Sequence, residues 1–163
     1  MAETAKIQLS KGKVALVDAD MFDYLNQWSW FYHKNGYAMR SYRKDGKYRK
    51  DRMHRVVVNA PLGLDVDHIN GNKLDNRREN LRIATRSQNN ANKRMQSNNT
   101  SGYRGVNWHK QRGKWVAKIQ VDRKSIHLGL YEKKEDAARA YNKAAVLYYG
   151  EFAQLNNIKE ESA

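Results

Sequence analysis

The N-terminal third of the chain carries short runs in which apolar and polar positions alternate, a pattern that predicts antiparallel β-strands. Asn35-Gly36 and Asp45-Gly46 lie between runs, and both dipeptides favour tight hairpin turns. The larger apolar residues of these runs fit alternating faces of a small sheet, where core packing is their default role. We expect strands at residues 13–18, 28–34, 37–44 and 51–58, with Val14, Leu16, Trp28, Trp30, Tyr37 and Met39 supplying its apolar faces.

The pattern changes after Pro61, the only proline of the chain. The segment from Val66 onward is polar and rich in turn residues, and it becomes helix-like from about Ser87. Residues 95–102 are rich in Asn, Ser, Thr and Gly, which is typical of a solvated linker. We therefore expect a first domain over residues 1–94 and a linker over 95–102.

A second domain is predicted over residues 103–157, followed by a tail at 158–163. Three strand-like runs at 103–110, 113–122 and 124–131 precede an amphipathic helix at Lys133–Tyr149. In the middle run two sets of side chains alternate, so one set faces the helix and the other faces outward. The inner set is Trp115, Ala117, Ile119 and Val121, and the outer set is Val116, Lys118 and Gln120.

Lysine and arginine total 31 against 17 acidic residues, a formal net charge of +14 in 163 residues. Such an excess is typical of surfaces that bind nucleic-acid phosphates, although ribosomal and membrane-surface proteins share it and a solvated surface is the simpler alternative. The chain has no cysteine, which excludes disulfides and thiolate zinc sites. No apolar run approaches the ~20 residues of a membrane span, and the N-terminal residues lack the apolar core of a signal peptide. We expect a protein of the cytoplasm, with no membrane partner.

Asp67 and His68 are the first candidates for chemistry. A metal nuclease needs a general base to activate water and a divalent cation to stabilise charge on the phosphate. Histidine suits the base because its ordinary pKa leaves it largely neutral at physiological pH, and Mg²⁺ prefers oxygen ligands such as a carboxylate. Adjacent strand residues point to opposite faces, so this pair requires a twist or bulge to serve one phosphate. Taken singly, an Asp capping a turn and a structural His are the simpler explanations.

The segment from Met53 to Arg94 resembles the HNH nuclease motif in the variant carried by bacteriophage and intron homing endonucleases. The resemblance rests on Asp-His, Asn-Gly-Asn, Asp-Asn-Arg, Glu-Asn-Leu-Arg and a later Asn, which occur in that order. The family fold is two antiparallel strands and a helix around one metal ion. The resemblance thus implies an α+β protein in which a small N-terminal sheet leads into a ββα-metal domain.

The same resemblance implies a role for each of four residues. Asp67 is a metal ligand and His68 the general base. Asn80 hydrogen-bonds the base and holds its ring in the productive orientation. Asn89, where many members have His, is the second metal ligand, although its neighbours Asn90 and Asn92 leave the register open. Oxygen ligands favour Mg²⁺ or Mn²⁺ over zinc.

Other residues around the motif have two interpretations. Four arginines are candidate phosphate clamps, and an ordinary solvated basic face is the alternative: Arg77, Arg78, Arg82 and Arg86. His54, which precedes the motif, is interpreted as a packing or phosphate-contact residue rather than a metal ligand.

The second domain, from Tyr103 to Asn156, resembles the AP2 DNA-binding domain, known from plant transcription factors and from fusions to phage HNH nucleases. The YRGV opening, the GKW-A-I and LG-Y strands and the EDAARAYN helix carry the resemblance. Such domains place a three-stranded sheet in the DNA major groove, with the helix packed behind it. Positions matching the family's DNA contacts are Arg104, Asn107, His109, Gln111, Lys118, Gln120 and His127. Only Arg104 keeps the plant residue type, and a plain surface role is the alternative for His109 and His127.

Together these features predict a site-recognising DNA endonuclease of the homing type that nicks one strand of double-stranded DNA. One site per chain favours a monomer, and double-strand cleavage would need a dimer or a second turnover. The alternative from another class is a DNA-binding transcriptional regulator with a vestigial nuclease domain. A basic RNA-binding protein is a third alternative, for which no module is recognisable.

Overall fold

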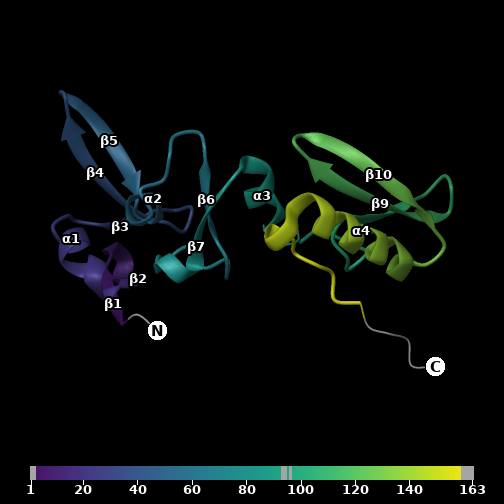
Figure 1. Ribbon diagram of the computed structural model, residues 1–163, viewed down its shortest axis with the longest axis horizontal. Coiled ribbons are helices and arrows are strands. Elements are labelled where there is room, and N and C mark those ends of the chain that lie inside the picture. The colour runs from purple at the N-terminus through teal and green to yellow at the C-terminus, as the bar shows by residue number, and fades with distance from the viewer. Residues whose placement is uncertain (1–2, 93–94, 96, 159–163) are drawn as a thin grey trace. The chain divides into compact units, whose positions relative to one another are not determined.

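The computed structural model describes residues 3–92, 95 and 97–158, and it divides the chain into two compact units, Met1–Thr85 and Arg86–Ala163. Both units are α+β, with small antiparallel sheets (Figure 1). Within the described residues, no helix combines the length and apolar character that crossing a membrane requires.

The first unit contains three small antiparallel sheets, which are the hairpin β1–β2, the sheet β3-β4-β5 and the pair β6–β7. Short helices connect them. The elements are β1 (Thr4–Gln8), β2 (Val14–Asp18), α1 (Phe22–Asn26), β3 (Phe31–Tyr32), β4 (Ala38–Lys44), β5 (Lys47–Arg52), α2 (Met53–Val57), β6 (Asp65–His68) and β7 (Leu81–Ala84).

The core of this unit differs from the predicted one in two places. Ala15 and Val17 are the fully buried residues of β2, so the inner face is the one opposite to the predicted Val14 and Leu16. The predicted strand over 51–58 ends at Arg52 and continues as helix α2. The β-branched run favours a strand, but α2 instead buries His54, and it places Met53 and Val57 in the core cluster that also holds Leu25 and Trp30.

The hairpin of β4 and β5 extends beyond the rest of the first unit (Figure 1). Its strands pair from Met39↔Arg52 to Lys44↔Lys47, and the predicted turn at Asp45-Gly46 is confirmed. Both turn residues have positive φ, 51° and 71°, as a type I′ hairpin requires.

In the second unit, a three-stranded sheet in the order β10-β9-β8 packs against one long helix, as predicted. Ala117 and Ile119 of the middle strand are buried, while Lys118 and Gln120 are exposed on the opposite face. Val116, predicted to face outward, is buried. The elements are α3 (Arg86–Ala91), β8 (Val106–His109), β9 (Lys114–Val121), β10 (Lys124–Tyr131) and α4 (Lys134–Tyr149).

The second half of the predicted linker needs correction. Positions 93, 94 and 96 and the tail from 159 onward lie outside the described residues. Ser101 is buried, and its hydroxyl donates to the carbonyl oxygen of Val106 at 2.8 Å. The Asn99 amide donates to the carbonyl of Tyr103 at 2.9 Å. These bonds make Asn99–Gly102 part of the second unit, because a polar side chain can be buried when the fold supplies its hydrogen bonds.

Helix α3 also belongs to the second unit. The Ser87 hydroxyl accepts a hydrogen bond from the backbone N–H of Asp122 at 3.1 Å, and α3 contacts the 3₁₀ turn Gly150–Phe152. The compact units therefore divide after Thr85, whereas the predicted first domain runs to residue 94.

Candidate functional site

Asp67 and His68 are the last two residues of β6, which pairs with β7. The ladder runs without a register shift through Asp67↔Arg82 and His68↔Leu81, so the predicted bulge is not part of this pairing. Both side chains are buried, at 4% and 5% exposure, and the strand ends at His68. The pair therefore lies at the end of β6, where the loop to β7 begins.

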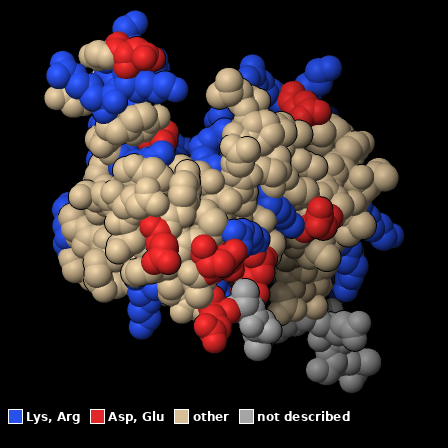
Figure 2. Space-filling view, turned by 60° about the vertical axis from the view of Figure 1, so that its left-hand side comes forward, with Lys and Arg blue, Asp and Glu red and all other residues tan. Residues whose placement is uncertain are grey.

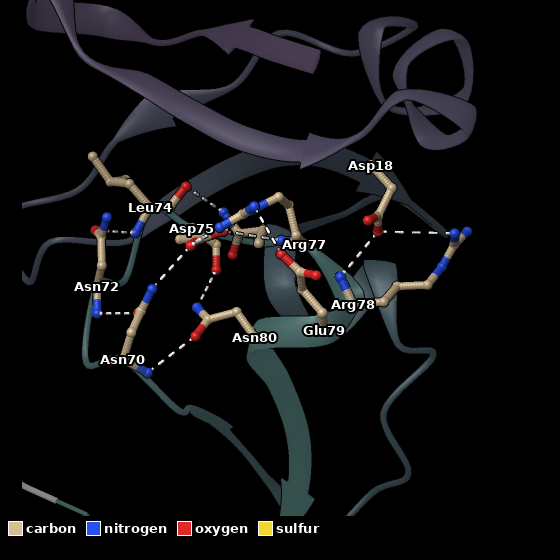
Figure 3. Close-up of polar contacts among 10 residues, drawn as sticks. Asp18, Asn70, Asn72, Leu74, Asp75, Arg77, Arg78, Glu79 and Asn80 are labelled. Atoms are coloured by element: carbon tan, nitrogen blue, oxygen red, sulfur yellow. Dashed lines mark hydrogen bonds and ion pairs between the residues drawn. The ribbon is translucent and has the colours of Figure 1, made fainter. Parts of the chain in front are cut away.

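The loop from Ile69 to Asn80 is held by its own side chains (Figure 3). Oδ1 of Asn80 accepts from the backbone N–H of Asn70 at 3.0 Å, and its Nδ2 donates to the carbonyl of Asp75 at 2.8 Å. Asn70 in turn donates to Asp75 at 2.9 Å. Among the described residues, Asn80 thus bonds the two sides of the loop rather than the His68 ring, which corrects the predicted direct contact.

Strand β2 anchors this loop from outside. Leu16 accepts a backbone hydrogen bond from Asn76 and donates one to Leu74, both at 2.8 Å. The Asp18 carboxylate accepts the backbone N–H of Arg78 at 2.9 Å. The N-terminal hairpin therefore fixes the loop that carries the motif, although nearly sixty residues separate Asp18 from Arg78.

The His68 ring is held by a hydrogen bond at one edge and by aromatic contacts. Its Nε2 lies 3.3 Å from Oδ1 of Asn76, whose own Nδ2 donates to the Leu74 carbonyl at 3.3 Å. The His54 ring packs edge-to-face against it with centroids 5.0 Å apart, and Tyr37 lies 5.1 Å from His54 and 6.1 Å from His68. Because Asn76 Oδ1 is an acceptor, this contact places a proton on Nε2.

Burial keeps both histidines neutral at physiological pH. It lowers the pKa of His54 to about 3, helped by the nearby charges of Arg52 and Arg55. Burial also lowers the pKa of His68, opposed by the hydrogen bond with Asn76 and by the charge of Asp67. A neutral, oriented imidazole at His68 is the state that can accept a proton.

The Asp67 carboxylate pairs with Arg82 across the strands. Arg82 Nε donates to Asp67 Oδ2 at 2.9 Å, and Nη2 lies 2.8 Å from the same oxygen. A buried carboxylate favours a positive charge beside it, and in this structure Arg82 supplies that charge. Mg²⁺ is commonly held by one or two carboxylates and otherwise by water and phosphate oxygens. The Asp67 carboxylate is therefore a suitable type of ligand for Mg²⁺. Within the described segments, His, Cys, Asp and Glu side chains form no group of three that could hold a metal.

The other predicted metal ligand, Asn89, lies on α3 and is half-buried. Its helix is bonded within the second unit through Ser87, and Oδ1 of Asn92, the residue after the helix, accepts from Gln154 at 2.5 Å.

Three of the four predicted phosphate clamps form ion pairs with carboxylates of the chain itself. Arg77 makes a bidentate pair with Asp75, both bonds at 2.8 Å, which holds the pKa of Asp75 below its ordinary value. Arg78 binds Asp20, at 2.7 Å, and Arg82 binds Asp67. Arg86 is exposed on α3. Phosphate binding by these four arginines stays a prediction.

The predicted DNA-binding face of the second unit is assembled from all three strands. Lys118 lies directly opposite His127, and Asn107 and His109 occupy the same face of β8 by their register against Val116 and Lys114. This face is opposite to the buried Ala117, which packs with Val106 of β8 and with Ala137 and Ala138 of α4. The predicted residues lie on this face or in its turns; Asn107, Gln111, Lys118, Gln120 and His127 are exposed, and Arg104 and His109 are half-buried.

Two further residues contact the candidate base, and neither contact was predicted from the sequence. Asn76 is not among the predicted site residues, yet it is fully buried against the His68 ring. His54 was assigned to packing or phosphate contact, and its packing partner is His68 itself. The available signal was that another histidine and another Asn accompany the motif, but only the fold brings them to the His68 ring, His54 on α2 and Asn76 in the closed loop.

Two segments of the chain match family models, residues 52–91 the HNH endonuclease model and residues 101–151 the AP2 domain model. An uncharacterized HNH endonuclease of Acanthamoeba polyphaga mimivirus is 34% identical over 155 residues, or 91% of this chain and 77% of that protein. Protein 3.8 of Escherichia phage T7 is 32% identical over 113 residues, or 66% of this chain and 93% of that protein. An ethylene-responsive transcription factor of Arabidopsis thaliana is 42% identical over 62 residues, or 37% of this chain and 14% of that protein.

Proposed function

The chain belongs to the HNH endonuclease family, and from this premise we propose that it is a site-recognising DNA endonuclease of the homing type that nicks one strand of a duplex. The observation that carries the proposal is the His68 ring, buried, neutral and held by Asn76 at the end of the strand that bears Asp67. A vestigial domain in a DNA-binding regulator has no need for a base kept in this state.

In the proposed mechanism, His68 accepts a proton from the attacking water. Asn76 and His54 hold its ring, and Asn80 fixes the loop behind it. Because burial lowers the pKa of His68, the ring is unprotonated and ready as a base at pH 7. A divalent ion, which HNH nucleases generally use, would supply charge stabilisation at the phosphate, and Mg²⁺ or Mn²⁺ with Asp67 as a ligand is our choice.

The AP2 domain supplies recognition in this proposal. Its exposed face presents Lys118, Gln120 and His127, whose side chains can hydrogen-bond base edges or phosphates in a major groove. Arg104, Asn107, His109 and Gln111 complete the proposed contact set, and Arg77, Arg78, Arg82 and Arg86 remain its proposed counterparts around the nuclease motif. One base per chain predicts one cut per binding event, so a monomer nicks and a dimer is needed to cut both strands together.

Supercoiled plasmid carrying a target selected from a random library tests the proposal. With Mg²⁺ the wild-type protein should convert it to the open circle, while EDTA or His68→Ala should abolish conversion without weakening binding. Binding with no Mg²⁺-dependent nicking would establish the regulator instead. Combined Lys118→Ala and Gln120→Ala should reduce the preference for the selected site while leaving nicking of other DNA.

A further inference from the structure

The outer part of the β4–β5 hairpin is a strongly cationic and unusually exposed ribbon. Every residue from Arg43 to Lys50 is exposed, and Tyr48 retains 80% of its surface. One of the hairpin's two carboxylates, Asp51, is neutralised by Arg40 at 2.8 Å. In Figure 2, lysine and arginine surround the projection at the upper left, with acidic atoms between them. The exposed cations of the hairpin are Arg43, Lys44, Lys47, Arg49, Lys50 and Arg52.

Such a ribbon lacks the usual source of stability. A two-stranded hairpin is marginal in water unless a core or a partner covers one face. Here the pairs Arg43↔Tyr48 and Lys44↔Lys47 leave both faces of the tip in solvent. Like charges lie directly opposite each other at Lys44 and Lys47, an arrangement that destabilises a sheet until anions neutralise it. A polyanionic partner would remove this repulsion.

The cationic surface continues from the hairpin toward the candidate base. Arg52, the last residue of β5, stacks over the Tyr37 ring with its guanidinium 5.0 Å from the ring centroid. Lys73 of the motif loop lies 4.7 Å from the same centroid. Tyr37 in turn lies 6.1 Å from His68. A phosphate chain bound along the hairpin would therefore be led to the aromatic cluster at His68.

We propose that the β4–β5 hairpin, with Arg52 and Lys73, is a second DNA-binding element that grips the phosphate backbone of duplex DNA beside the cutting site. This inference rests on the proposed function. Residues 38–51 of the hairpin lie outside both segments that match family models. A two-stranded ribbon fits the major groove of B-DNA. The exposed side chains of the outer ribbon are mainly Lys and Arg, which neutralise phosphates, so the proposed contact is mainly electrostatic.

The test uses the full chain in EDTA, so that binding is measured without cleavage. The hairpin variant combines Arg43→Ala, Lys47→Ala and Arg49→Ala. The matched control removes three exposed lysines of the same unit, by Lys6→Ala, Lys11→Ala and Lys13→Ala. Fluorescence anisotropy on a duplex gives the dissociation constant at several salt concentrations. Because each phosphate contact contributes about 0.9 to the slope of log K against log salt, the hairpin variant should lower that slope by about 2–3, and the control by less than about 1.

Hydroxyl-radical footprints on the selected duplex should shorten at one end only in the hairpin variant, with the remainder protected as in the wild type. An unchanged slope, an equal loss in the control, or an unchanged footprint would overturn the proposal. Tighter binding to single-stranded DNA or RNA than to duplex would overturn it as well. A protein that never nicks DNA would refute the proposed nuclease, yet these binding results would stand on their own.

Discussion

Arg82 and the buried Asp67 form an ion pair in which two guanidinium nitrogens contact a single carboxylate oxygen, at 2.8 and 2.9 Å. The two residues are direct cross-strand partners on β6 and β7, so the register of the motif itself creates the pair. Arg82 therefore neutralises the Asp67 carboxylate, which is the group that we propose as a metal ligand.

Removing Arg82 should destabilise the metal-free protein and tighten its binding of divalent ions. Arg82→Met removes the guanidinium that pairs with the Asp67 carboxylate, whose side chain is 5% exposed, and breaking a buried pair costs about 3–5 kcal/mol. Urea unfolding in EDTA measures that loss. Arg78→Met, which breaks an exposed pair with Asp20, should cost less than about 1 kcal/mol and serves as the control.

The same Arg82→Met variant should bind Mn²⁺ about tenfold more tightly, because a competing positive charge has left the carboxylate. Electron paramagnetic resonance of free Mn²⁺ gives the affinity directly. Weaker Mn²⁺ binding in this variant would contradict the assignment of Asp67 as a ligand that Arg82 neutralises.

His54 should affect turnover through the orientation of the base. His54→Ala removes the ring that packs 5.0 Å from His68, so kcat should fall by about tenfold while KM for the target duplex stays constant. His54→Phe restores an aromatic wall and should keep kcat within about threefold of the wild type. Single-turnover nicking by both variants, with thermal melts to verify folding, makes the comparison. Equal losses in the two variants would show that packing at His54 does not orient the base.

The low pKa of His54 predicts an acid-sensitive fold. In the native state this ring titrates at about 3, whereas an unfolded histidine titrates near its ordinary value of 6.5. Between these values the unfolded state binds more protons, so the free energy of unfolding decreases as pH falls, by at most about 1.4 kcal/mol per pH unit for this one group. His68 contributes in the same direction because its pKa is also lowered.

Urea unfolding between pH 6.5 and 4.5 measures this slope. The window lies above the range in which Asp75 titrates, because Arg77 lowers the pKa of that carboxylate. His54→Phe should have a shallower slope than the wild type by up to one proton. An identical slope in both proteins would mean that His54 is protonated in the native state.

The sequence predicted local turns better than the contacts around His68. Asp-Gly at 45–46 was enough to place a hairpin turn, since only a few residue pairs accept positive φ at both positions. The pairing of His68 with Asn76 could not be read in this way, because it depends on how a loop of twelve residues closes. The contact of Arg78 with Asp20 joins positions 58 residues apart, and no local pattern encodes it. Helix α2 was missed because its Val56 and Val57 favour strands locally, whereas tertiary burial selected a helix.

Gly105 should be the least replaceable glycine of the AP2 domain. A Cβ there would lie 2.1 Å from Tyr141 Cδ2 and 2.6 Å from the Lys118 carbonyl oxygen, and the residue has φ of 73°. Gly105→Ala therefore combines left-handed strain with a clash that the buried Tyr141 ring and a strand backbone cannot relieve without moving. We expect a loss of about 3 kcal/mol or more in the unfolding free energy. Gly113→Ala is the matched control, because its φ is 59° with nothing within 4 Å, so it isolates the strain at about 1–2 kcal/mol. Urea unfolding of the two variants gives the difference, and equal losses would mean that Tyr141 moves aside at little cost.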